Sequence, residues 1–318
     1  MSSNPISKYS WQIKANSTFI WTCVSKFYSS ILLVFLSCIC TTSTAQTLQE
    51  NLPVTNGTVF AIVRDGNTIY LGGDFNFVGL NSTYGSALDI TTGIPNLAFA
   101  KPNGKVETSV ADGSGGWYIG GHFTSVGGVT RNGLARINAD GSLNNWNPDA
   151  NNIVYNLAIS GGTVYAGGDF TIIGGQTRNR LASIDATTGA INAWNPDANS
   201  FVSCLAINGG TVYIGGDFNG VGGQTRNGLA SIDATTGAIN VWNPDANAFV
   251  SSLAISGGTV YIGGDFTIIG GQARNGLASI DATTGAINAW NPDANNIVYS
   301  LAISGGTVYA GGRFTTHS

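Results

Sequence analysis

Short runs of alternating apolar and polar residues, separated by glycine-rich turns, fill the chain after its first 45 residues. Such alternation predicts β-strands that bury one face, and no window has the periodicity of an amphipathic helix. One stretch shows four such runs in succession: Val154 to Ile159, Thr163 to Phe170, Leu181 to Asp185, and Ala190 to Trp194. The pattern therefore predicts an all-β protein.

The connections between these runs carry turn chemistry. Ser160-Gly161-Gly162 joins the first two strands, and the longer segment Thr171 to Arg178 joins the second to the third. Asp185 can accept hydrogen bonds from turn N–H groups, and Gly189 can adopt the positive φ that a tight hairpin requires. We name the four predicted strands a, b, c and d, and we expect hairpins at a–b and c–d.

The four-strand unit is repeated along the chain. Its strand b closes on a phenylalanine, and successive copies are 48, 47, 48, 48 and 48 residues apart: Phe75, Phe123, Phe170, Phe218, Phe266 and Phe314. A period of 40 to 50 residues with four strands is typical of propeller blades. The fold class predicted is a β-propeller of about 48-residue four-stranded blades.

The two ends of the repeat region indicate six blades. Residues 47–53 align with residues 190–196, so we expect them to form a closing strand d. Five full repeats follow, and then a partial sixth that breaks off after strand b. The predicted domain is residues 46–318, with an incomplete last blade. Because strand c of that blade is missing, we expect the chain to be a fragment of a longer product.

The first 45 residues have the features of an export signal. A stretch containing three lysines precedes the apolar run from Ile31 to Cys40, and small residues end at Ala45. The apolar run is too short to cross a bilayer, which takes roughly 20 residues. We therefore predict a signal peptide at residues 1–45, no membrane span after its removal, and a secreted or cell-surface location, in a bacterium.

Charge excludes some partners. The chain has 13 basic and 17 acidic side chains; without residues 1–45 it keeps 10 basic ones and a net charge of −7. An acidic body without a basic cluster is unsuited to binding nucleic acid.

Without residues 1–45, Cys204 is the only cysteine of the chain, so no internal disulfide is expected. Equivalent positions hold Asn156, Ser252 and Ser300, which indicates a site for a small residue and not a nucleophile.

The joint pattern of the repeat resembles a known family. Gly-Gly-Asp-Phe, then Gly-Gly, then Arg-Asn-x-Leu-Ala-x-Ile-Asp, then Trp-Asn-Pro is similar to the bacterial delta-60 β-propeller repeats, filed as a domain of unknown function. The likeness covers residues 47 to 316. More distant likeness connects it to fungal cortical polarity-marker and kelch-type propellers. The resemblance implies a propeller on an exported surface protein and supplies no catalytic residues.

Polar residues of the repeat gather in the b–c and d–a connections, which emerge on one face of a propeller. We therefore place a candidate binding site there. One arginine per blade could grip carboxylates or sugars, or instead pair with Asp169, Asp217 and Asp265 across the hairpin. One aspartate per d–a loop sits in an Asn-x-Asp-x-Asn pattern, either a turn with Asx caps or the start of a calcium loop. The candidate residues are Arg131, Arg178, Arg226, Arg274, Asp149, Asp197, Asp245 and Asp293.

The tryptophan that ends strand d either packs between blades or offers a stacking platform for sugars. Enzymatic motifs are absent from the sequence, and near-identical repeats do not make the asymmetric site that catalysis needs. We expect a non-catalytic β-propeller that binds protein or glycan or acts as a scaffold, with no cofactor and with calcium left open. The alternative is a secreted polysaccharide-acting hydrolase or lyase that uses propeller-face aspartates.

Overall fold

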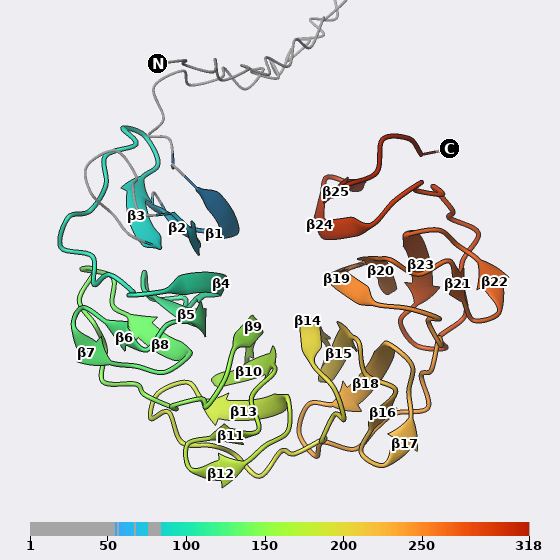
Figure 1. Cartoon of the computed structure of the whole chain (residues 1–318), viewed down its shortest axis with the longest axis horizontal. Helices are drawn as coiled ribbons and strands as arrows, with labels where there is room; N and C mark the ends of the chain where they lie inside the picture. Colours follow the sequence, from blue (N-terminus) through green and yellow to red (C-terminus); the bar gives the residue numbers. More distant parts are fainter. Residues whose placement is uncertain (1–54, 56, 67, 76–83, 318) are drawn as a thin grey trace, which may run out of the picture. The chain divides into compact units, whose positions relative to one another are not determined.

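The computed structural model describes residues 55, 57–66, 68–75 and 84–317. The described residues are all-β, arranged as successive antiparallel blades, which confirms the predicted propeller fold (Figure 1). The described residues contain no helix that is long and apolar enough to cross a membrane. The predicted signal peptide and the closing strand at 47–53 lie outside the described residues.

Each blade begins with a strand of seven or eight residues, corresponding to predicted strand a. These first strands are β1 (Thr58–Asp65), β4 (Lys105–Ala111), β9 (Val154–Ser160), β14 (Val202–Asn208), β19 (Val250–Ser256) and β24 (Val298–Ser304). Each packs against the first strand of the next blade, from β1 to β4 and so on to β24. We number the blades 1 to 6 in this order and call the contact between two neighbours a seam.

The second and third strands complete a three-stranded antiparallel sheet. The second strands are β2 (Thr68–Asp74), β5 (Trp117–His122), β10 (Thr163–Gly168), β15 (Thr211–Gly216), β20 (Thr259–Gly264) and β25 (Thr307–Gly312). The third strands are β3 (Gly85–Asp89), β8 (Leu134–Ile137), β13 (Leu181–Asp185), β18 (Leu229–Asp233) and β23 (Leu277–Asp281). In the described residues blade 6 contains its first two strands.

Predicted strand d is present but shorter than expected. In blade 3 it makes one bridge, Ile184 with Ile191, flanked by backbone hydrogen bonds from Asp185 N to Ala190 O and from Asn192 N to Ser183 O. The chain then leaves the sheet, and the side chain of Trp194 is buried at the seam. Blades 1 to 5 are thus four-stranded, with a reduced outer strand.

The b–c connection, expected to be a loop, contains a small hairpin. Its two-residue strands are β6 (Ser125–Val126) with β7 (Val129–Thr130), β11 (Ile172–Ile173) with β12 (Gln176–Thr177), β16 (Gly220–Val221) with β17 (Gln224–Thr225), and β21 (Ile268–Ile269) with β22 (Gln272–Ala273). Two glycines with positive φ turn each hairpin, such as Gly174 and Gly175. The hairpin also bridges the preceding d–a loop, for example Ile173 with Ala150.

The predicted c–d turn chemistry is confirmed. The Asp185 carboxylate accepts hydrogen bonds from Thr187 N at 3.0 Å and from Thr188 N at 2.7 Å, and Gly189 has a φ of 79°. The same bonds lower the pKa of Asp185, because the two Thr188 donors favour its charged form. Blades 4 and 5 repeat this turn at Asp233 and Asp281.

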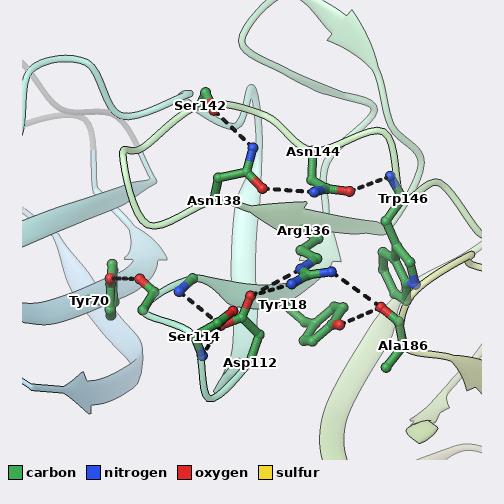
Figure 2. Close-up of polar contacts among 12 residues, drawn as sticks. Tyr70, Asp112, Ser114, Tyr118, Arg136, Asn138, Ser142, Asn144, Trp146 and Ala186 are labelled. Carbon is green, nitrogen blue, oxygen red and sulfur yellow. Dashed lines mark hydrogen bonds and ion pairs between the residues drawn. The ribbon is translucent and has the colours of Figure 1, made fainter. Parts of the chain in front are cut away.

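A tyrosine and a tryptophan from each of blades 2, 3 and 4 form hydrogen bonds across the seam to the next blade. Tyr165 and Trp194 are nearly fully buried, with ring centroids 5.4 Å apart. Tyr165 Oη donates to Ala234 O and Trp194 Nε1 to Asp233 O, each at 2.9 Å, so both reach the third strand of the next blade. Figure 2 shows the equivalent Tyr118 and Trp146, where Tyr118 Oη donates to Ala186 O. Packing between blades, one of the two predicted roles of the tryptophans, is confirmed at these seams.

The repeated Gly-Gly at the end of strand b has a steric cause. A Cβ on Gly167 would lie 2.9 Å from Val202 Cγ1 of the next blade, and one on Gly168 would lie 2.2 Å from Ile153 O. The absence of a Cβ at Gly167 therefore allows the neighbouring blade to pack closely. The second lies against a β-bulge in the first strand, where Tyr155 is the extra residue.

Candidate binding site

The b–c hairpins and d–a loops meet on one face, as predicted, and the aspartate of each d–a loop organises the junction. Asp197 has a left-handed φ of 59°, and its Oδ1 accepts a 2.7 Å hydrogen bond from Asn179 Nδ2. Aspartate tolerates this conformation better than most residues. The same bond recurs within blades 2, 4 and 5, where Asp149, Asp245 and Asp293 accept from an asparagine. The loop aspartates therefore fix their own blade.

The asparagine two residues later fixes the next blade. Asn199 Oδ1 accepts hydrogen bonds from Asn219 N and Gly220 N, both at 3.1 Å. Asn151, Asn247 and Asn295 make equivalent contacts. The second and third oxygens of the Asn-x-Asp-x-Asn pattern are thus engaged by protein donors, which supports the Asx-cap interpretation. No group of three His, Cys, Asp or Glu that could hold a metal occurs among the described residues.

The repeated arginines hold backbone carbonyls. Arg178 donates from Nη1 to Thr177 O at 2.8 Å and from Nη2 to Asn192 O at 2.9 Å, which ties the hairpin to strand d. Arg131, Arg226 and Arg274 repeat this arrangement. The expected pairing with Asp169, Asp217 and Asp265 is wrong for the described residues, where Asp169 instead forms an ion pair with Arg180.

Open cavities lie on the same face at several of the seams. The cavity at the seam of blades 2 and 3 measures about 570 Å³, and its lining includes His122, Asn132 and Asp149. At the seam of blades 4 and 5, Asp217 and Asp245 contribute to a cavity of about 530 Å³. A third, at the seam of blades 5 and 6, measures about 280 Å³. We call these the seam pockets.

Some of the predicted site residues line the pockets, and the others lie outside the pocket linings. Asp149 and Asp245 line seam pockets, and Asp197 lines a cavity of about 350 Å³ at the seam of blades 3 and 4. Asp293 is hydrogen-bonded beside the third pocket. The arginines are absent from the lining of these three pockets. Sequence reasoning missed the pocket-floor position occupied by Gly133, Gly228 and Gly276. Its signal was the departure from glycine in two blades, which have Tyr84 and Arg180 there, both with positive φ.

Beside the pockets, aromatic side chains line the first strands. Phe201 and Phe249 precede β14 and β19, with ring centroids 5.6 Å apart, and Tyr155 of β9 lies 6.0 Å from Phe201. All three are partly exposed. At the start of β4, the Lys105 ammonium pairs with the Glu107 carboxylate at 2.9 Å and lies over the Phe60 ring. The surface near the pockets therefore combines apolar rings with charge.

The remaining reactive groups are held in structural roles. Burial raises the pKa of the Cys204 thiol to about 12, which keeps it protonated and unreactive at neutral pH. On the opposite face, Arg136 pairs with Asp112 at 2.7 Å and also donates to Ala186 O (Figure 2).

The seam pockets offer carboxylate, amide and backbone groups, a chemistry suited to binding by hydrogen bonds and charge.

Comparisons with known proteins agree with the fold. Residues 112–145 match the family described as a domain of unknown function (DUF5122) beta-propeller, and residues 157–243 match the one described as outer membrane protein assembly factor BamB. No curated protein matches the chain. Neither family description uses the delta-60 name expected from the repeat pattern.

Solved structures include designed relatives of the fold. The computationally designed protein Ika8 is similar with a TM-score of 0.57 and 16% identity, over 81% of this chain and 69% of its own. The designed protein Ika4 matches with a TM-score of 0.35 and 18% identity, over 49% of this chain and 83% of its own. The Ika8 likeness concerns the fold alone. Together with the blades described above, the two family matches support a likeness to bacterial β-propeller repeat families.

Proposed function

We propose that this protein is a non-catalytic interaction module that holds a protein partner on its b–c/d–a face. One observation carries the proposal: an open polar pocket of the same construction returns at three seams of the described chain. Repetition of one contact favours multivalent binding, in which several weak interactions add up. A catalytic centre instead needs different groups converging on one reacting atom.

The surroundings of the pockets support a protein partner. Partly exposed rings at Phe201 and Phe249 lie beside acidic pockets, and aromatic anchors next to polar groups are typical of protein interfaces. Propeller domains also serve commonly as interaction platforms, which is an argument from the fold only. We further propose that the module works outside the cytoplasm, at the cell surface or secreted. The export-like residues 1–45 and the match to the BamB family support this location.

The test is a binding screen with two matched variants. Ala248 is exposed and lines the pocket between blades 4 and 5, whereas Asn208 is exposed at the end of β14, on the opposite face. A partner found among proteins of the cell envelope should lose affinity at least tenfold with Ala248→Trp and keep it with Asn208→Trp. Equal effects of the two variants would refute this site.

A glycan array and a polysaccharide turnover assay examine the alternatives in parallel. Glycan binding that is lost in Ala248→Trp would change the partner class while leaving the site intact. Turnover of a polysaccharide that is abolished by Asp217→Asn would replace the proposal with the hydrolase or lyase hypothesis. In that case the propeller-face aspartates would be the catalytic groups.

A further inference from the structure

At the seam of blades 3 and 4, a side chain of the protein itself occupies part of the pocket, beside a remaining cavity of about 350 Å³ lined by Asp197 and Asn199. Gly133, Gly228 and Gly276 on the pocket floors have φ values of 65° or 66°, and Arg180 at the equivalent place in blade 3 has the same φ of 65°. Positive φ strains any residue with a Cβ, and such strain persists only where the surroundings hold it. The unusual arginine therefore calls for a compensating contact.

A side chain at this position enters the pocket. A Cβ added to Gly228 would lie 3.3 Å from Ala248 O and 3.4 Å from Ala246 Cβ. Both residues line the cavity between blades 4 and 5. The same construction on Gly276 meets Asn296 O at 3.2 Å, in the next pocket along. Arg180, with the same backbone conformation, projects into the seam of blades 3 and 4 in the same direction.

The compensating contact is with the aspartate of the Gly-Gly-Asp-Phe motif. Arg180 Nε lies 3.4 Å from Asp169 Oδ1, and the Arg180 side chain is 23% exposed. Asn152 Nδ2 donates to the other carboxylate oxygen at 3.3 Å. This seam thus holds a guanidinium group against a carboxylate, within walls built from the same residues as the open pockets.

The two following seams keep the carboxylate and lack the arginine. Asp217 and Asp265 stand at the position of Asp169, and both are exposed. No hydrogen bond or ion pair engages either carboxylate in the part of the chain that the structure describes. Glycine replaces the arginine at each, so the cavity is open where the guanidinium lies in blade 3.

We propose that these two pockets, at the seams of blades 4 and 5 and of blades 5 and 6, bind arginine side chains of the partner protein. The inference rests on the proposed function and specifies the chemistry of its partner. Arg180 shows the ligand that the walls accept: a planar donor group that reaches a carboxylate along the pocket floor. At the seam of blades 2 and 3, His122 replaces the aspartate, so we expect that pocket to discriminate against arginine.

The probe is a capped Gly-Arg-Gly tripeptide titrated into the full chain and followed by NMR. A peptide with citrulline in place of arginine has nearly the same shape without the charge. We expect dissociation constants of order millimolar at Asp217 and Asp265 and at least tenfold weaker binding of the citrulline peptide. Equal binding of the two peptides, or shifts at the His122 pocket alone, would overturn the proposal.

Exchanging the floor residue supplies the sharper test. Arg180→Gly should open a third site at Asp169, and Gly228→Arg should close the site at Asp217 while leaving the one at Asp265. Blade 3 already carries arginine with this backbone conformation, so the second exchange is compatible with the fold. If Arg180→Gly adds no binding and Gly228→Arg removes none, the pockets do not take arginine.

A further pair of measurements separates this inference from the proposed function. Asp217→Asn combined with Asp265→Asn should abolish binding of the Gly-Arg-Gly peptide. A partner protein that still binds this double variant, and is still lost with Ala248→Trp, would overturn the arginine inference while the interaction module stands. Calcium chloride that saturates the same aspartates and outcompetes the peptide at equal concentration would identify a cation site instead, and would also overturn it.

Discussion

The seam between blades 3 and 4 and the seam between blades 5 and 6 contain the same pair of rings in different surroundings. Tyr165 and Trp194 contact edge to face at 5.4 Å, and Tyr261 and Trp290 do so at 5.3 Å. The first pair is almost completely buried, whereas the second is only partly buried. Ring geometry is thus set within one blade, independently of the neighbour.

The two seams differ in the hydrogen bonds that the tyrosine hydroxyl and the indole N–H make. Trp194 Nε1 and Tyr165 Oη donate to carbonyls around the third strand of blade 4. Within the described residues blade 6 offers its first two strands, and Tyr261 Oη and Trp290 Nε1 make no hydrogen bond there. The comparison shows that the neighbouring blade determines whether the tyrosine–tryptophan pair is buried and hydrogen-bonded. Stability should therefore depend on the neighbour more than on the blade.

The largest effect expected is the loss of a buried indole. Trp194→Ala should reduce the free energy of unfolding by about 3–5 kcal/mol, because it leaves a large cavity at the seam. Trp290→Ala should cost less than about half of that, since Trp290 is partly exposed. Urea denaturation followed by circular dichroism measures both. Equal losses would show that the indole acts within its blade.

A second matched pair probes the close approach of blades. A Cβ on Gly263 would lie 2.8 Å from Val298 Cγ1, whereas a Cβ on Gly311 meets nothing within 4 Å. Gly263→Ala should therefore destabilise by about 1–3 kcal/mol through overpacking. Gly311→Ala should change the free energy of unfolding by no more than about 0.5 kcal/mol. A neutral Gly263→Ala in thermal denaturation would mean that the seam adjusts to the added methyl group.

A smaller effect is expected from the tyrosine hydroxyl. Tyr165→Phe should cost about 1–2 kcal/mol, because the carbonyl of Ala234 loses its donor while buried. Tyr261→Phe removes a hydroxyl without a hydrogen bond and should stay within about 0.5 kcal/mol of the parent. The same urea titration applies. If the two variants behave alike, the hydrogen bond across the seam contributes nothing.

The mildest effect concerns acid. The turn aspartates Asp185, Asp233 and Asp281 have a pKa below the ordinary value of 3.8, because the N–H and hydroxyl of the threonine three residues on favour the carboxylate. A lowered folded pKa gives stability that is present above the unfolded pKa and is lost as pH falls through the folded one. Stability should thus decline below about pH 4, at the turns that accept the indoles.

Asparagine at such a turn provides the control. Asp233→Asn keeps an oxygen that accepts turn N–H groups and removes the titrating group. The urea midpoint of this variant should fall less steeply between pH 4 and pH 2.5 than that of the parent. An unchanged slope would assign the acid sensitivity to other carboxylates.

The repeat period, the turn residues and the face that carries the pockets all follow from the sequence. They do so because each depends on a local pattern: alternation for strands, Asp and Gly for turns, and the order of connections for the face. The buried position of the tryptophans also follows, since a large apolar side chain at the end of every strand d has few other places to go.

Other features depend on contacts that a sequence does not display. Arg178 was expected to meet a carboxylate and instead donates to Asn192 O, because the small hairpin carries it away from Asp169. That hairpin has strands of two residues, too short for alternation to reveal. The role of Arg180 depends on a left-handed backbone and on a pocket floor, and neither can be recognised before the seams are assembled.

The bulge in every first strand has one more consequence. It leaves one residue per blade outside the ladder, and these residues differ between blades more than their surroundings do: Phe60, Glu107, Tyr155, Ser203, Ser251 and Tyr299. A residue that makes no ladder pair can be exchanged without shifting the register of the sheet. The propeller thereby separates the paired strand residues, which set the fold, from the bulge residues, which can vary and could distinguish one blade's surface from another's. Duplication of a blade copies both.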